Sequence, residues 1–231
     1  MIKTVMLDID NTLLSFDKYV EYALESGFEK FGIKGYSADT CRIFHFVNDK
    51  LWRGIEDGTL TFEELKKCRF NKVFAELGIE ADGPLFETYF RECIHEHAAP
   101  IEGSLELLEY LDNKYILCAA SNGPDEQQKH RLEIAGMLKH FDYVFTSEAI
   151  GMPKPSEEFF SACMNIINEK QDEKMTYAEV MMIGDSITAD MTGAITLGMT
   201  TCFYNPKGKT VPEDMKVDYE VKTLLEIKNI L

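Results

Sequence analysis

Short runs of mainly hydrophobic residues recur along the chain and predict the strands of a buried sheet. The runs cover residues 4–7, 115–120, 143–145, 180–183 and 199–204. None of them alternates with polar residues, which is typical of strands covered on both faces, as in a parallel sheet. Segments with apolar residues at helical spacing lie between the later runs. This alternation predicts an α/β fold with a doubly wound parallel sheet and a Rossmann-like core.

Residues 16–97 depart from this alternation and predict four helices without a strand. Their apolar residues recur every three or four positions, as on one face of a helix. Thr61 begins a capping-box pattern at the start of the third predicted helix, which ends near Gly78. An all-helical segment after the first strand of an α/β fold predicts an insertion. We therefore expect residues 1–15 and 98–231 to form a catalytic core and the inserted segment to form a cap.

Polar residues directly follow three of the predicted strands, at the carboxyl end of each. They are Asp8, Asp10 and Thr12 after the first strand, Ser121 and Asn122 after the second, and Asp185 after the fourth. All strands of a parallel sheet end at one edge, so we expect these groups to converge there. Open α/β sheets bind their ligands at this edge.

Three of these residues, Asp8, Asp10 and Asp185, carry carboxylates that would repel one another unless a cation lay between them. Hard oxygen ligands suit Mg²⁺, which also takes an oxygen of a substrate phosphate. A carboxylate can attack phosphorus to form an aspartyl-phosphate, and a second carboxyl group can act as acid and then as base. Asp8 and Asp10 are two residues apart and are expected to flank one phosphate. The pattern predicts a Mg²⁺-dependent phosphohydrolase.

Two further residues add to this chemistry. Lys154 lies between Pro153 and Pro155, whose rigid φ angles are expected to hold it in place. Asp190 follows Asp185 by five residues and is expected to orient Lys154 or a metal-bound water, or to favour the start of a helix. Ser121, with its neighbouring backbone N–H groups, is a candidate for binding a phosphoryl oxygen.

Four segments resemble, in order, the motifs of the haloacid dehalogenase-like hydrolase superfamily: LDIDNT, AASNG, GMPKPSEEFF and IGDSITADMTGA. The resemblance implies an Asp8 nucleophile and an Asp10 acid and base, with the backbone carbonyl of Asp10 also binding the metal. The other implied roles are phosphate binding by Thr12, Ser121 and Asn122, charge neutralisation by Lys154, and Mg²⁺ binding by Asp185. Asn11 replaces the glycine usual in the first motif, and asparagine tolerates left-handed geometry.

The helical segment is similar to the cap of one large branch of that superfamily. Within it, LWRGIEDGTLTFEELKKCRF resembles the pyrimidine 5′-nucleotidases and implies a nucleoside 5′-monophosphate substrate. Because the core recognises only the phosphoryl group, the cap is expected to select the leaving group. Trp52, Arg53 and Arg69 are the candidate residues. Substitution of either arginine is expected to change substrate preference more than stability, and Trp52 is expected either to stack on a base or to pack in the cap.

Composition narrows the possible partners. The chain has 40 acidic and 24 basic residues and a formal net charge of −16, which disfavours a nucleic-acid polymer as partner. A small phosphorylated metabolite remains compatible if the site supplies positive charge locally. The six cysteines are widely spaced, and the sequence predicts neither a secretory signal nor a membrane span. We therefore expect a cytoplasmic protein, monomeric or homodimeric, that does not bind a membrane.

The sequence is also compatible with other functions. A sugar-phosphate or phosphoglycolate phosphatase, or a phosphomutase, would use the same scaffold. A mutase must bind a second phosphate, for which Arg42, Arg53 and Arg69 are available. A dehalogenase is disfavoured because cleavage of a carbon–halogen bond requires no general acid at Asp10. A non-catalytic phosphate-binding module would lack the nucleophile or the metal ligands, and all of these are present.

Overall fold

The computed structural model describes residues 1–231, which divide into two compact units. Met1–Ser15 and Ala98–Leu231 form one unit, called here the core unit. Phe16–His97 form the other, called here the helical unit. The helical unit is inserted shortly after the first strand, so the chain leaves the core unit and returns to it before building the other strands.

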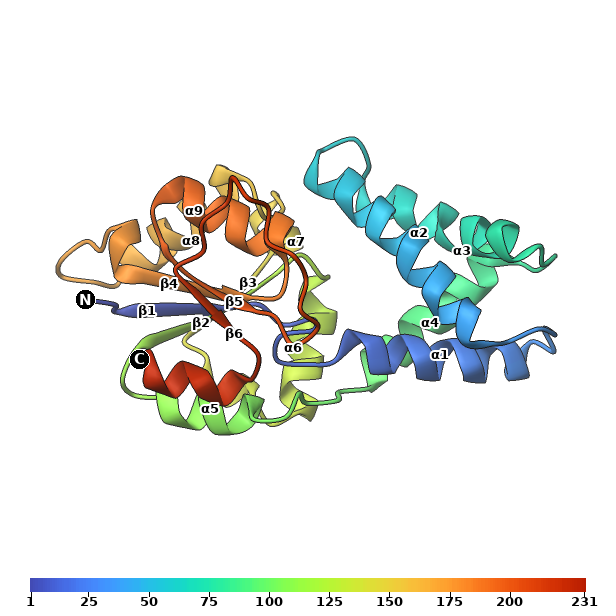
Figure 1. Cartoon of the computed structure of the whole chain (residues 1–231), viewed down its shortest axis with the longest axis horizontal. Coiled ribbons are helices and arrows are strands. Elements are labelled where there is room, and N and C mark those ends of the chain that lie inside the picture. The colour runs from blue at the N-terminus through green and yellow to red at the C-terminus, as the bar shows by residue number, and fades with distance from the viewer. The chain divides into compact units, whose positions relative to one another are not determined.

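The core unit is built on a sheet of six parallel strands in the order β3-β2-β1-β4-β5-β6 (Figure 1). The strands are β1 (Thr4–Leu7), β2 (Ile116–Ser121), β3 (Tyr143–Thr146), β4 (Val180–Gly184), β5 (Thr200–Tyr204) and β6 (Tyr219–Val221). From β1 the chain adds strands first on one side and then, from β4, on the other. The winding direction therefore reverses between β1 and β4, where open α/β sheets bind ligands. The predicted fold class is confirmed, and only the three-residue β6 was not predicted.

Helices cover both faces of the sheet, which explains the runs of mainly hydrophobic residues. Val5 and Leu7 of β1 pack into one hydrophobic layer, and Met6 packs into the opposite one. The first layer is formed with α5 (Ser104–Leu111), α6 (Asp125–Ile134) and η4 (Leu224–Asn229), and the second with α8 (Glu157–Asn168) and α9 (Thr192–Leu197). Successive strand residues point to opposite faces, so every position of a doubly covered strand is buried. The short elements η1 (Leu138–His140), α7 (Ser147–Ile150), η2 (Tyr177–Glu179) and η3 (Ile187–Met191) complete the core unit.

The helical unit contains four helices and no strand, as predicted. They are α1 (Phe16–Lys30), α2 (Ala38–Glu56), α3 (Phe62–Leu77) and α4 (Gly83–Glu96). Thr61 and Glu64 form the predicted capping box before α3, and Gly78 ends this helix in the left-handed conformation, with φ of 65°. None of the protein's helices combines the length and the apolar character that crossing a membrane requires.

Aromatic rings fill the interior of the helical unit. The Phe70 ring centroid lies 4.6 Å from that of Phe86 and 5.1 Å from that of Phe90. These three rings are buried, and pairs at such distances add to the stability that burial provides. The Phe28 ring of α1 lies 5.9 Å from Phe86 and the Phe44 ring of α2 lies 5.7 Å from Phe70, between centroids, so the four helices share one hydrophobic core.

Arg69 lies inside this aromatic core and is only 3% exposed. Its Nε and Nη2 atoms donate to the two carboxylate oxygens of Glu87 at 2.9 and 2.6 Å, and its Nη1 donates to Asn48 at 3.0 Å. The guanidinium carbon lies 4.7 Å from the centre of the Phe90 ring. The structure does not support the prediction that Arg69 selects the substrate, because its side chain is buried and each of its three nitrogens donates inside the helical unit.

The two other candidates of this unit differ in exposure. Arg53 is exposed and forms no ion pair, so its side chain is available at the surface of α2. Trp52 is half-buried, with its ring centroid 5.7 Å from that of Phe62. Packing on Phe62 agrees with the second of the two roles predicted for Trp52, although part of the indole stays accessible.

Replacing Arg69 by methionine should destabilise the helical unit strongly. The substitution leaves the Glu87 carboxylate buried without its partner, which costs about 3–5 kcal/mol. Urea unfolding followed by the fluorescence of Trp52, the only tryptophan, measures this loss, because Trp52 lies in the helical unit. Arg53→Met removes the same charge from an exposed site and should leave the transition unchanged. The double variant Arg69→Met/Glu87→Met should recover most of the loss, and equal stability of Arg69→Met and wild type would contradict this account.

Candidate active site

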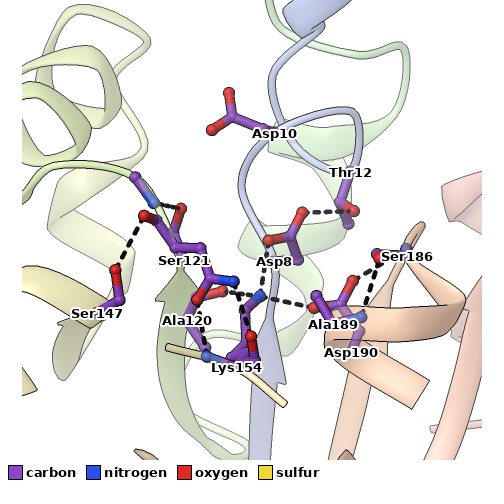
Figure 2. Close-up of polar contacts among 12 residues, drawn as sticks. Asp8, Asp10, Thr12, Ala120, Ser121, Ser147, Lys154, Ser186, Ala189 and Asp190 are labelled. Carbon is purple, nitrogen blue, oxygen red and sulfur yellow. Dashed lines mark hydrogen bonds and ion pairs between the residues drawn. The ribbon is translucent and has the colours of Figure 1, made fainter. Parts of the chain in front are cut away.

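The candidate residues gather at the carboxyl edge of the sheet, beside the reversal between β1 and β4 (Figure 2). Asp8 follows β1, and Asp185 follows β4, which pairs with β1 directly. Carboxylate oxygens of Asp8, Asp185 and Asp190 lie within 4.8 Å of one another. The meeting of Asp8 with Asp185 is the convergence expected of parallel strands.

Lys154 places a positive charge at the centre of this cluster and is 1% exposed. Its Nζ donates to Oδ1 of Asp8 at 2.9 Å, to Oδ1 of Asp190 at 2.6 Å and to the carbonyl of Ala120 at 2.6 Å. All three ammonium hydrogens are therefore used. Burial opposes the charge of Lys154, but the carboxylates of Asp190 and Asp8 outweigh it and raise the pKa above its ordinary value. The ammonium stays charged.

The backbone of Lys154 is held by Asn122. The side-chain amide of Asn122 donates to the Lys154 carbonyl at 2.9 Å and accepts from the Lys154 N–H at 2.8 Å. Both ends of this amide are used by Lys154, so the prediction that Asn122 binds phosphate rests on its backbone N–H. The Asn122 side chain fixes the segment that carries the buried lysine.

Asp190 is fully buried in η3, a single π-helical turn. Its Oδ2 accepts from the Ser186 N–H at 3.0 Å, and its Oδ1 accepts from Lys154. A Cβ atom at Gly184 would lie 2.1 Å from Oδ2 of Asp190, so only glycine leaves room for this carboxylate. Of the roles predicted for Asp190, the geometry supports orientation of Lys154.

Asp8 is held from its other side by Thr12, whose hydroxyl donates to Oδ2 of Asp8 at 3.1 Å. The turn that brings Thr12 back passes through Asn11, whose φ of 62° is in the left-handed region that asparagine tolerates. Burial raises the pKa of Asp8 to about 7; the charge of Lys154 opposes this rise and that of Asp190 adds to it. Thr12 contacts the candidate nucleophile itself, which the sequence did not predict.

The side chain of Asp10 does not join the carboxylate cluster. Its Oδ1 accepts from Nη1 of Arg131 at 2.7 Å and its Oδ2 from Nε2 of Gln128 at 2.6 Å. Figure 2 shows this carboxylate directed away from Asp8. The expectation that Asp8, Asp10 and Asp185 meet through their side chains is corrected, because β1 ends at Leu7 and the chain has already turned at Asp10.

Sequence reasoning missed Gln128 and Arg131, because neither belongs to a motif. Both lie on the buried face of α6, where apolar residues such as Leu132 are expected. Two polar residues three positions apart on the inward face of a helix are the one sequence signal that could have identified them.

Lys209 was also missed, because it belongs to none of the four motifs. Its Nζ donates to Oδ2 and to the backbone carbonyl of Asp185, at 2.8 Å in both cases. Burial raises the pKa of Asp185 to about 6; the charge of Lys209 opposes this rise and that of Asp8 adds to it.

The cluster of Asp8, Asp185 and Asp190 has the chemistry of a site for a hard divalent cation. Its side-chain ligands are carboxylate oxygens close together, which Mg²⁺ prefers over nitrogen or sulfur ligands. Burial is the main cause of the raised pKa values of Asp8 and Asp185, and a bound cation would offset the cost of keeping these buried carboxylates charged. The Asp190 side chain is completely buried, whereas those of Asp8 and Asp185 keep some exposure, so Asp8 and Asp185 fit Mg²⁺ best.

Curated relatives span nearly the whole chain. The HAD-hydrolase YfnB of Bacillus subtilis is 32% identical over 99% of this chain and 95% of its own. The pyrimidine 5′-nucleotidase PynA of Streptococcus pneumoniae is 30% identical over 99% of this chain and 97% of its own. The pyrimidine 5′-nucleotidase YjjG of Escherichia coli is 27% identical over 98% of this chain and 96% of its own.

A solved structure and a family model agree with these relatives. The orthorhombic crystal structure of YfnB, which is bound to magnesium and reveals interdomain movement, superimposes with a TM-score of 0.88. The superposition covers 100% of this chain and 98% of the YfnB chain. The model of the haloacid dehalogenase-like hydrolases matches residues 2–198, which include every candidate residue of the core unit except Lys209. The chain belongs to the haloacid dehalogenase-like hydrolase family.

Proposed function

We propose that this hydrolase cleaves phosphate monoesters through an aspartyl-phosphate on Asp8, with Mg²⁺ as cofactor. The observation that carries the proposal is the placement of Asp8. One of its oxygens is fixed by Lys154 and the other by Thr12, next to the carboxylate of Asp185. A carboxylate held in this way can meet phosphorus in one orientation, which lowers the entropic part of the barrier.

The reaction proceeds in two displacements. An oxygen of Asp8 attacks phosphorus, the bond to the leaving oxygen breaks, and Asp10 gives that oxygen a proton. Asp10 then takes a proton from water, whose oxygen attacks phosphorus and releases inorganic phosphate from Asp8. The positive charge of Lys154 and the hydroxyl of Ser121 stabilise the phosphoryl oxygens. Mg²⁺, held by Asp8, Asp185 and the backbone carbonyl of Asp10, would supply the positive charge that offsets repulsion between Asp8 and the phosphate.

Activity should require Mg²⁺ and be lost with EDTA, and binding of the ion should weaken at low pH. The pKa values of Asp8, about 7, and of Asp185, about 6, mean that both groups take up protons as the pH falls through this range. A protonated carboxyl is a poor ligand, so the Kd for Mg²⁺ should rise at least about tenfold from about pH 8 to about pH 5.5. Calorimetry at both pH values measures this, with Asp185→Asn as a control that binds weakly throughout. An unchanged Kd, or full turnover without metal, would contradict the metal assignment.

Replacing Asp10 by asparagine should remove general acid and base catalysis but keep the nucleophile. We expect kcat for an alkyl phosphate to fall roughly 10²–10⁴-fold. The first step with p-nitrophenyl phosphate should fall far less, because its leaving group needs little protonation. Single-turnover kinetics with both esters measures the difference, and equal losses would remove Asp10 from the role of acid.

The substrate class we propose is nucleoside 5′-monophosphates, with pyrimidines preferred over purines. Two relatives of nearly full length, PynA and YjjG, are pyrimidine 5′-nucleotidases. Phosphate is bound by the core unit, so the base must be recognised elsewhere, and we assign this to the helical unit as the cap. Trp52 offers part of an indole, and stacking on an aromatic ring contributes roughly 1–3 kcal/mol per base in single-strand binders. Arg53 offers an exposed donor on the same helix.

Comparison of kcat/KM for dUMP, TMP, dAMP, glucose 6-phosphate and phosphoglycolate tests the substrate class. We expect dUMP and TMP to rank first, and Arg53→Ala to change the ranking. Arg42→Ala removes an exposed charge from the same helix and should leave the ranking unchanged. If glucose 6-phosphate or phosphoglycolate exceeded the nucleotides about tenfold, the nucleotidase proposal would fail, and the phosphatase mechanism would stand.

A further inference from the structure

Two polar side chains of α6, Gln128 and Arg131, are completely buried beside Asp10. Burying a guanidinium or an amide destabilises a protein unless its polar atoms are paired. Apolar residues would cover the sheet at these positions without that penalty. The presence of both side chains therefore calls for an explanation in terms of the group they contact.

Hydrogen bonds link Gln128, Arg131 and Asp10 to one another in a closed ring. Nη1 of Arg131 donates to Oδ1 of Asp10 at 2.7 Å and to Oε1 of Gln128 at 2.8 Å. Nε2 of Gln128 donates to Oδ2 of Asp10 at 2.6 Å and to the hydroxyl of Ser121 at 2.7 Å. The amide has one possible orientation, since its oxygen faces a donor and its nitrogen faces a carboxylate. Asp10 is thus fixed at both oxygens.

The Gln128 side-chain amide also packs against the segment Ser121-Asn122-Gly123, which belongs to the second motif. A Cβ atom at Gly123 would lie 2.3 Å from Nε2 of Gln128, so the glycine of the Ser121-Asn122-Gly123 segment leaves the space that Gln128 occupies. The Gly123 N–H also donates to the Ser121 hydroxyl at 3.0 Å. One amide therefore links the candidate acid and base, Asp10, to the candidate phosphate-binding hydroxyl, Ser121.

The direction in which Asp10 is held agrees with its chemistry. In an in-line displacement the leaving oxygen lies on the side of phosphorus opposite the attacking oxygen. The acid that protonates it must therefore reach a point beyond phosphorus as seen from Asp8, and the Asp10 carboxylate, directed away from Asp8, leaves the attacking side free (Figure 2). A carboxylate has about four lone-pair sites, so two donors leave sites free to carry the transferred proton.

We propose that Gln128 and Arg131 are positioning residues, which hold Asp10 at a fixed place relative to Ser121 and thus to the leaving oxygen. This inference rests on the proposed role of Asp10 as acid and base. Neither residue is required to touch the substrate. Their effect passes through Asp10, which distinguishes them from residues that stabilise the fold alone.

Single-turnover kinetics of Arg131→Met and Gln128→Met, with dUMP and with p-nitrophenyl phosphate, tests this proposal. We expect kcat for dUMP to fall roughly 10- to 100-fold, the usual effect of a misplaced catalytic group, with little change for the aryl ester. Arg131→Lys keeps a donor and should recover part of the loss, and it serves as the second variant if Arg131→Met folds poorly. Glu133→Gln, at an exposed position of the same helix, is the matched control and should behave as wild type.

A double-mutant cycle provides the decisive comparison. In an Asp10→Asn background, Arg131→Met should reduce kcat less than about twofold further, because its effect acts through Asp10. Gln128→Met should also lose most of its effect there, and any remainder measures its separate hydrogen bond to Ser121. Equal losses with both esters, or full losses in the Asp10→Asn background, would overturn the proposal. If Asp10→Asn itself showed no dependence on the leaving group, the proposed mechanism would be at fault instead. If dUMP is not a substrate, glucose 6-phosphate replaces it and the comparison is unchanged.

Discussion

A buried ammonium group between two buried carboxylates holds the functional edge of the sheet together. Lys154 contacts Asp8 after β1, Ala120 in β2 and Asp190 after β4, so one side chain connects three adjacent strands. Charges at this depth must be paired, because leaving one uncompensated costs about 3–5 kcal/mol. Two neighbouring residues support the ion pairs of Lys154. Asn122 fixes the backbone of the lysine, and Gly184 leaves room for the Asp190 carboxylate.

The same rule of pairing extends across the site. Arg131 contacts Asp10 and Lys209 contacts Asp185, so the aspartates of the site each have a basic partner, drawn from separate segments of the core unit. Three basic side chains offset most, but not all, of the charge of the four aspartates. In a chain with a net charge of −16, an anionic ester therefore still requires the positive charge of a bound cation at this site.

Hydrophobic patterning and motif order predicted the sheet, the inserted helices and the convergence of Asp8 with Asp185. These features follow from local rules: doubly covered strands are apolar throughout, and parallel strands end at one edge. The direction of a single side chain does not follow from such rules. Asp10 was expected beside Asp8, but Arg131, more than one hundred residues away in sequence, draws it elsewhere. Arg69 illustrates the same limit, since only tertiary packing reveals that Glu87 and Asn48 enclose it.

In the mechanism that we propose, Asp8, held by Lys154 and Thr12, becomes covalently phosphorylated. The most direct measurement uses the Asp10→Asn variant, which lacks the base for hydrolysis and should accumulate the intermediate. After reaction with substrate and acid quench, borohydride reduces an aspartyl-phosphate to homoserine, which peptide mass spectrometry locates. The account predicts homoserine at position 8, absent when Asp8 is also replaced by asparagine. Homoserine at another position, or substrate turnover with no trapped residue, would contradict it.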